Sequence, residues 1–368
     1  MKCPHCLAEL KYVDRPKRTC RYCQQQFALE PRENELKLSD LKLRGLAEWL
    51  SRKGVCRYTA AQLAHAAVRQ RLKPDYHQIF SFPNLVYPRS WLWFVALAAI
   101  VFFTLVFLSM SIEGLISSIL VLVVLLLLPI ILEKKLQRFP DPRSLQFEAL
   151  YIEPWQAIHG PLPGLANYTK VTSLRQTHNH IPIEQVRAFV VSPVEDVLYC
   201  LLANELPQRL WLTLINPYHS DLESQLALVR RHPQIPILVI HDASVAGCLL
   251  PALLPQQWRL TPAHRVIDLG LRPADVQLYR LPWRYDPVDK LSLELLHQAQ
   301  STGATNFSDD EMKWLTAGSV TSVLFLPPAQ LIRLVVRAVE QYGPPGLDPK
   351  AEAQARAIGF MTWPQPSA

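Results

Sequence analysis

The chain has 368 residues, of which 49% are hydrophobic and 19% are charged. This length exceeds a single small domain, and the composition excludes disordered, collagenous and coiled-coil chains. The net charge of +7 is uneven: residues 1–90 hold 17 Lys and Arg against 8 Asp and Glu, a net +9, whereas residues 133–368 hold 21 against 22, a net −1. The basic N-terminal quarter favours contact with anionic lipid or nucleic acid.

Two Cys-x-x-Cys pairs lie near the N-terminus, Cys3 with Cys6 and Cys20 with Cys23. Four thiolates at this spacing are typical of a tetrahedral Zn²⁺ site and predict a zinc ribbon over residues 1–30. So small a unit buries little core, so structural Zn²⁺ is expected to supply much of its folding free energy. Spacing alone does not separate zinc from iron, and a redox pair is disfavoured because no strand precedes the first cysteine. The other cysteines are expected to be reduced core residues: Cys56, Cys200 and Cys248.

Residues 36–73 form a basic segment with helical spacing of apolar residues. Ser39 is expected to cap a first helix that ends near Gly54, and Thr59 a second that runs to about Leu72. Such a pair is similar to a helix-turn-helix or winged-helix fragment, but it lacks the run of Asn, Gln and Arg on one face that base readout needs. Nucleic-acid binding is therefore an alternative that the sequence does not favour.

Two uncharged runs, Trp91–Ile112 with 22 residues and Leu115–Leu132 with 18, are separated by two residues. Each is long enough to cross a bilayer, so they predict a two-helix transmembrane hairpin over residues 91–132. Lys and Arg flank the hairpin and are absent from its turn, which places both termini in the cytoplasm and the chain in an inner or plasma membrane, with the lipid bilayer as a partner. The alternative is a hydrophobic hairpin buried inside a larger protein.

Residues 140–185 are rich in Pro, Gly and aromatic residues and are expected to form a loop-rich segment that leads into the next domain. His178 and His180 lie within it. An exposed turn is a better explanation for this pair than a metal site, because the pair lies in a polar loop that has no cysteine near it in the sequence.

From residue 186 to about 300, continuous apolar runs alternate with helical patterns. Strands are predicted at residues 186–191, 211–215, 235–240 and 265–271. Strands buried on both faces and alternating with helices predict a Rossmann-like α/β domain with a parallel sheet. Ligands of such sheets bind beyond the carboxyl ends of the strands, where the sequence places Ser192, Asn216 and Asp242.

Three stretches of this region resemble a known family. They read FVVSPVEDVLYCLLANEL, IPILVIHDASVAGCLL and DLGLRPADVQLY, and they look like the signature stretches of the Toprim domain in the A subunit of topoisomerase VI and its meiotic relative. The resemblance covers about 95 residues, 186–280. It implies a Toprim-like fold whose metal site holds Mg²⁺ with a Glu after the first strand and an Asp-x-Asp, followed by Pro-x-Gly, after the third.

Carried over residue by residue, the resemblance implies a degenerate cleft. The Glu position is occupied by Ser192, the first Asp by Asp242, the second Asp by Ser244, the Pro by Val245 and the Gly by Gly247. One carboxylate holds Mg²⁺ poorly, and Tyr58, the nearest candidate for the family's nucleophile, lacks that motif. DNA cleavage is therefore not expected, and a generic Rossmann-like sheet in which Asp242 caps the next helix is the alternative.

The C-terminal part begins with a predicted helical extension over residues 301–343. Ser308 and Glu311 have the spacing of a capping box, a strand is expected over residues 318–326, and a helix is expected from Pro328 to Tyr342. Residues 344–368 are expected to form a loosely ordered tail.

Together these features predict a membrane-anchored, cytoplasm-facing scaffold or sensor that has a structural zinc ribbon and a Toprim-like domain without a catalytic constellation. A protein partner is expected, and the degenerate cleft is available for a protein or a small ligand. The alternatives are a membrane-tethered nucleic-acid-binding protein and a divergent metal-dependent enzyme that uses Asp242.

Overall fold

The computed structural model describes four ranges of the chain, residues 1–71, 146–168, 182–219 and 222–344. Three of the predictions fall outside these ranges: the hairpin over 91–132, the pair His178 and His180, and all but the first residue of the tail.

No helix within the four described ranges is both long and apolar enough to cross a membrane. The longest, α15 (Pro328–Tyr342), has 15 residues and spans roughly 22 Å, which is short of a hydrocarbon core of about 30 Å. The described residues therefore give no support to the transmembrane hairpin, to the membrane localisation with cytoplasmic termini or to the membrane part of the fold class, and residues 91–132 themselves lie outside the described ranges. The hairpin was predicted from hydropathy, and helices buried inside proteins share that pattern.

The fold is α/β, and its centre is the predicted parallel sheet. Its four strands lie in the order β2-β1-β3-β4, and their bounds are β1 Ala188–Val191, β2 Leu212–Ile215, β3 Ile237–Val239 and β4 Val266–Asp268. All four residues of β1 are buried, because helices cover both faces of the sheet, and this explains the continuous apolar run. The chain passes from β1 to β2 on one side and then to β3 on the other, so the strand order reverses beside β1.

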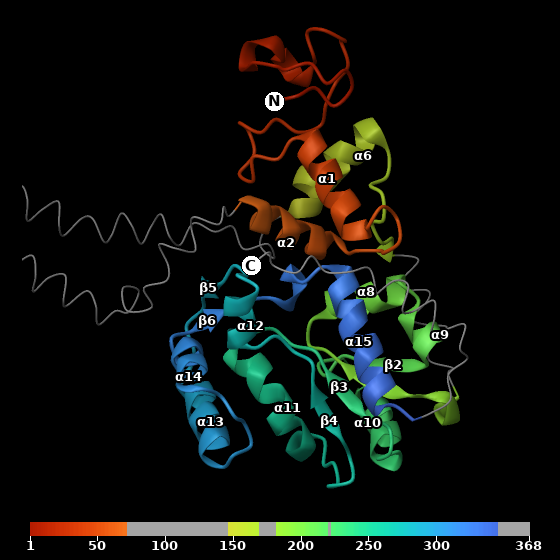
Figure 1. Cartoon of the computed structure of the whole chain (residues 1–368), viewed down its shortest axis with the longest axis vertical. Coiled ribbons are helices and arrows are strands. Elements are labelled where there is room, and N and C mark those ends of the chain that lie inside the picture. Colours follow the sequence, from red (N-terminus) through yellow and green to blue (C-terminus); the bar gives the residue numbers. More distant parts are fainter. Residues whose placement is uncertain (72–145, 169–181, 220–221, 345–368) are drawn as a thin grey trace, which may run out of the picture. The chain divides into compact units, whose positions relative to one another are not determined.

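The helices between the strands lie on opposite faces of the sheet, because right-handed crossovers in opposite directions require it. One face packs on α10 (Leu222–Arg231) and α11 (Val245–Gln257) through a buried cluster that includes Phe189, Ile237 and Val229. The first crossover is formed by α8 (Glu195–Ala203) and α9 (Leu206–Leu210), and α15, blue in Figure 1, contacts both of these helices.

The N-terminal part consists of short turns, two helices and a helical segment from beyond residue 145. Its elements are η1 Tyr12–Asp14, η2 Pro16–Arg18, α1 Asp40–Ser51, α2 Ala60–Arg71, the π-helical turn η3 Glu148–Ile152 and α6 Glu153–His159. Both helices predicted between residues 36 and 73 are present, and Thr59 caps the second by accepting the N–H of Gln62. The first ends at Ser51, three residues before Gly54, because Arg52 adopts the left-handed conformation.

Side-chain bonds to the main chain join this N-terminal part to the sheet domain. The amide of Asn204, after α8, accepts the N–H of Arg57 at 2.8 Å and donates to its carbonyl at 2.9 Å. Tyr58 pairs with Leu165 as an isolated β-bridge. The guanidinium of Arg69, on α2, donates to the carbonyl of Phe325 at 3.3 Å. Helix α2 is thereby held at the C-terminal part of the domain.

Between β4 and α15 the chain forms helices and a small antiparallel sheet. These elements are α12 Pro273–Leu278, β5 Arg284–Tyr285, α13 Lys290–Ser301, α14 Asp309–Thr316, β6 Ser319–Val320 and η5 Val323–Phe325, and one further 3-10 helix, η4 Ile183–Gln185, precedes β1. The predicted capping box of α14 is present, since Ser308 accepts the N–H of Glu311 and Glu311 accepts that of Ser308. The strand predicted after Gly318 is only two residues long and is followed by the 3-10 helix η5.

Candidate metal cluster and strand-end pocket

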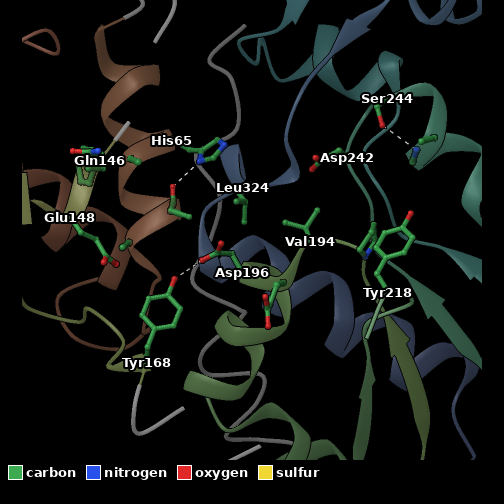
Figure 2. Close-up of a pocket in the computed structure, with 18 of the residues that line it drawn as sticks. His65, Gln146, Glu148, Tyr168, Val194, Asp196, Tyr218, Asp242, Ser244 and Leu324 are labelled. Carbon is green, nitrogen blue, oxygen red and sulfur yellow. Dashed lines mark hydrogen bonds between the residues drawn. The ribbon is translucent and has the colours of Figure 1, made fainter. Parts of the chain in front are cut away.

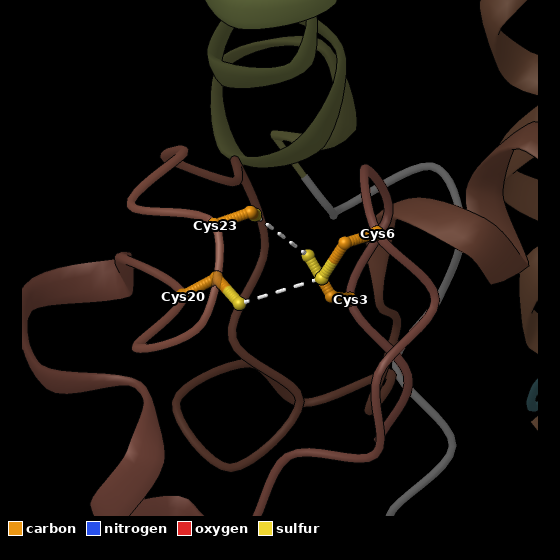
Figure 3. A group of neighbouring side chains, drawn as sticks. All are labelled: Cys3, Cys6, Cys20 and Cys23. Carbon is orange, nitrogen blue, oxygen red and sulfur yellow. Dashed lines mark hydrogen bonds between the residues drawn. The ribbon is translucent and has the colours of Figure 1, made fainter.

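The four N-terminal cysteines form one cluster, with their Sγ atoms within 4.8 Å of one another (Figure 3). The Sγ atoms of Cys3 and Cys23 lie 3.7 Å apart, and those of Cys6 and Cys20 lie 3.8 Å apart. Four sulfurs that each lie about 2.3 Å from a central Zn²⁺ would be separated by about 3.8 Å, the edge of that tetrahedron. These separations are too long for a disulfide. The cluster is therefore compatible with a zinc site.

The surroundings of the cysteines also fit a bound cation. Cys3 and Cys20 are fully buried, and the N–H of His5 donates to Sγ of Cys3 at 3.4 Å. Desolvation raises the pKa of Cys3 to about 12. Desolvation also acts on Cys20, but the N–H groups of Cys23 and Tyr22 outweigh it and lower the pKa of Cys20 to about 7. A cation at the centre is what would hold Cys3 as a thiolate.

At the carboxyl ends of the strands, the side chains assigned to the degenerate cleft bond to their own main chain. Ser192 is fully buried, and its hydroxyl accepts the N–H of Val194 at 3.2 Å. It therefore forms a local turn and does not cap α8, which begins three residues later at Glu195. Asn216 accepts the N–H of Tyr218 at 3.0 Å in a similar turn.

The cleft residues after β3 are also engaged. Oδ1 of Asp242 accepts the N–H of Val323 at 2.7 Å and the hydroxyl of Ser322 at 3.2 Å, so this carboxylate holds η5 against the sheet and does not cap the helix that follows it. Ser244 is the N-cap of α11, because its hydroxyl accepts the N–H of Gly247 at 3.1 Å. A Cβ at Gly247 would lie 2.3 Å from the carbonyl oxygen of Asp242, so only glycine permits this close approach.

These engaged side chains do not gather into a metal site. In the part of the chain that the structure describes, the N-terminal cysteines are the one group of three or more Cys, His, Asp or Glu that come close enough together to share an ion. Asp242 therefore belongs to no group of three or more such ligands among the described residues.

A pocket of about 760 Å³ opens at the same strand ends. Figure 2 shows Gln146, Glu148 and His65 on one side of it and Asp242 and Ser244 on the other. Its lining comes from α2, from η3 and α6, from the loops after β1, β2 and β3, and from η5. The loops after β1 and β3 meet where the strand order reverses, which is where open α/β sheets bind ligands.

The charges that line this pocket are all of one sign among the described residues. Its carboxylates are Glu148, Glu153, Glu195, Asp196 and Asp242, and no Lys or Arg accompanies them. The hydroxyl of Tyr168 donates to Oδ1 of Asp196 at 2.7 Å. Burial, together with the charge of Asp196, raises the pKa of Tyr168, so the phenol stays neutral and donates to this carboxylate.

Sequence reasoning missed the side of the pocket that η3 and α6 form. The N–H of Glu153 bonds to the carbonyl of Glu148, so the two carboxylates stand one π-helical turn apart. Both lie in the segment predicted to be loop-rich. The five-residue spacing of these two residues differs from the 3.6-residue period that predicts an α-helix. π-Helical turns are rare in proteins, but those that occur are often found at functional sites.

Comparisons of this chain with protein-family models, with curated proteins and with solved structures found no match. The likeness to a Toprim domain therefore remains a prediction from three stretches of sequence.

Proposed function

We propose that this chain is a ligand-binding protein, a sensor or scaffold, whose strand-end pocket takes a positively charged small molecule. The observation that carries this proposal is the lining of the pocket, whose described residues include five carboxylates and neither a lysine nor an arginine. A volume of about 760 Å³ lies within the range of about 300–1,000 Å³ that small-molecule sites occupy. An organic amine offers both the positive charge and the hydrogen-bond donors that carboxylates accept.

Binding is favoured over catalysis because the polar groups nearest the strand ends already have partners. The hydroxyl of Ser192 and the carboxylate of Asp242 are bonded within the fold, so neither is poised as a nucleophile or a general base. The acidity of the pocket also disfavours nucleic acid at this site, because phosphates would be repelled.

The second part of the proposal is that the cysteine cluster holds Zn²⁺ as a structural ion. The buried group of residues around the cysteines consists of Cys3, Leu10 and Cys20, with Met1 and Cys23 packed against it. Three of these five residues are cysteines of the cluster, so little apolar surface is left to hold the two cysteine pairs together without metal. Zn²⁺ is favoured because its preferred geometry with four thiolates is tetrahedral.

The pocket proposal is tested on the full chain with spermidine as a cationic probe and citrate as an anionic one, at matched ionic strength. Calorimetry is expected to show saturable binding of spermidine and none of citrate. Ala246→Trp places a large side chain on an exposed position of the pocket lining and is expected to abolish the binding. Absence of spermidine binding, or equal binding by this variant, would overturn the proposal.

Charge recognition is tested with Glu148→Gln combined with Glu153→Gln. Removal of two of the five carboxylates is expected to weaken spermidine binding severalfold. The matched control is Glu294→Gln, an exposed carboxylate on α13 outside the pocket, and it is expected to leave the affinity unchanged. An unchanged affinity in the double variant would show that shape and not charge selects the ligand.

A further inference from the structure

One helical segment connects the pocket with the cysteine cluster. The π-helical turn η3 runs directly into α6, so residues 148–159 form one rod. Glu148 and Glu153, near its beginning, line the pocket. His159 is its last residue and lies against the ribbon.

His159 has three partners, of which two belong to the ribbon or its exit. Its ring stacks on that of His5, with centroids 5.3 Å apart, and packs at a tilt against that of Trp155, with centroids 4.2 Å apart. Its Nε2 hydrogen-bonds to Oδ2 of Asp40. His5 lies between Cys3 and Cys6 in the sequence. The turn formed by this first Cys-x-x-Cys pair, called here the first knuckle, therefore carries the ring on which His159 packs.

Asp40, the other partner of His159, also hydrogen-bonds to the last residues of the ribbon. It is fully buried at the start of α1, and its two carboxylate oxygens accept the N–H groups of Ala28 and Leu29 at 2.8 Å each. The last residues of the ribbon and the last residue of α6 therefore bond to the same carboxylate. A buried carboxylate with these donors has a defined position, and loss of the donors would release it.

We propose that metal occupancy of the cysteine cluster sets the position of the η3–α6 side of the pocket through His5, His159 and Asp40. Metal fixes the first knuckle and with it the ring of His5. His159 then anchors the end of α6, and the rod holds Glu148 and Glu153 in the pocket. This inference rests on the proposed function, since it makes ligand binding in the pocket depend on the metal in the ribbon. By linkage, the ligand would in turn tighten the retention of metal.

The coupling is tested without any ligand, by hydrogen exchange on the full chain in its zinc-loaded and chelator-treated forms. Removal of zinc is expected to speed amide exchange over residues 148–159 at least tenfold, while β1, in the centre of the sheet, keeps its protection. Unchanged exchange over residues 148–159 would overturn the coupling. Equal loss of protection in β1 would overturn it as well, because it would mean global unfolding.

The role of His159 is tested with His159→Ala, and with His297→Ala, an exposed histidine on α13, as the matched control. Zinc-loaded His159→Ala is expected to bind zinc normally yet to exchange over residues 148–159 as fast as the zinc-free parent, and zinc removal is expected to add nothing. His297→Ala is expected to behave like the parent. A zinc-dependent change in His159→Ala as large as that in the parent would overturn the assigned route.

Spermidine affinity separates this inference from the proposed function. If both hold, zinc removal weakens spermidine binding at least tenfold in the parent and not in His159→Ala. If the exchange responds to zinc but spermidine binds neither form, the proposed ligand class is wrong and the coupling stands. If spermidine binds equally with and without zinc, control of ligand binding by the metal is overturned.

Discussion

His241 donates from Nε2 to Oδ1 of Asp268 at 2.9 Å, and the histidine has no exposed surface. His241 follows β3 and Asp268 ends β4, so the bond joins two neighbouring strands at their carboxyl ends. The other ring nitrogen, Nδ1, lies 2.8 Å from the carbonyl of Asp242. The ring thereby supports the backbone at the edge of the pocket.

Gly270 packs directly on this ring, and we expect Gly270→Ala to be destabilising. An added Cβ would lie 2.2 Å from two atoms of the His241 ring, so the ring or the backbone must shift. Overpacking of this kind costs about 1–3 kcal/mol. Urea unfolding would measure the loss. The matched control is Gly45→Ala in the exposed middle of α1, where nothing lies within 4 Å and where alanine is expected to stabilise by about 0.5–1 kcal/mol. Equal stabilities of the two variants would contradict this packing.

Asp268 gives the fold a specific dependence on pH. Burial opposes its ionisation, but the hydrogen bond and charge of His241 and the N–H of Gly270 outweigh burial and hold the pKa of Asp268 below its usual 3.8. A lowered pKa contributes stability that is present above the usual value and is lost as the pH falls through the folded-state value. Asp268→Asn should therefore reduce the free energy of unfolding near neutral pH, and the difference from the parent should shrink below about pH 4. A difference that stays constant from pH 7 to 3 would contradict this.

The ion pair between Arg272 and Glu311 is expected to hold the C-terminal extension to the domain. Nε and one terminal nitrogen of the guanidinium donate to the two carboxylate oxygens at 3.2 and 3.0 Å, and Glu311 is only 7% exposed. Because Glu311 also completes the capping box of α14, Glu311→Ala is expected to cost about 2–3 kcal/mol. The control is Asp310→Ala in the exposed pair with Lys313, for which about 0.5 kcal/mol or less is expected. Similar losses in both variants, measured by urea unfolding, would contradict the argument.

The metal cluster predicts one Zn²⁺ per chain, measured by elemental analysis of the purified protein. Cys20→Ala should lose the Zn²⁺, because the three remaining thiolates bind the ion far more weakly than four do. Cys248→Ala should retain it, because Cys248 lies in the separate core formed by α11, α13 and α14. Cobalt substitution provides a second readout, since a tetrahedral thiolate site gives an intense visible spectrum. Full metal content in Cys20→Ala would exclude the cluster as the site.

Local signals predicted much of this fold. The apolar runs at residues 186–191 and 235–240 became β1 and β3, and the capping box at Ser308 opens α14 where expected. These signals succeed because both requirements act on residues that are close in sequence. A strand buried on both faces needs a continuous apolar run, and the free N–H groups at the start of a helix need a nearby capping side chain. Hydropathy is a weaker guide over residues 91–132, which lie outside the described ranges, because an apolar run does not specify whether lipid or protein surrounds it.

The sequence by itself determined the cysteine cluster and the location of Asp242 at the end of a strand. Both follow from patterns within short stretches of sequence, the spacing of the cysteines in each Cys-x-x-Cys pair and the length of the apolar run before Asp242. Only the tertiary structure decided what Asp242 does, since its partner Val323 lies 81 residues away. The same is true of the pocket, whose carboxylates at positions 148 and 242 come to line one cavity through folding alone, and of His159, which hydrogen-bonds to Asp40 across 119 residues. Contacts at such separations depend on how the chain packs, and no local pattern records them.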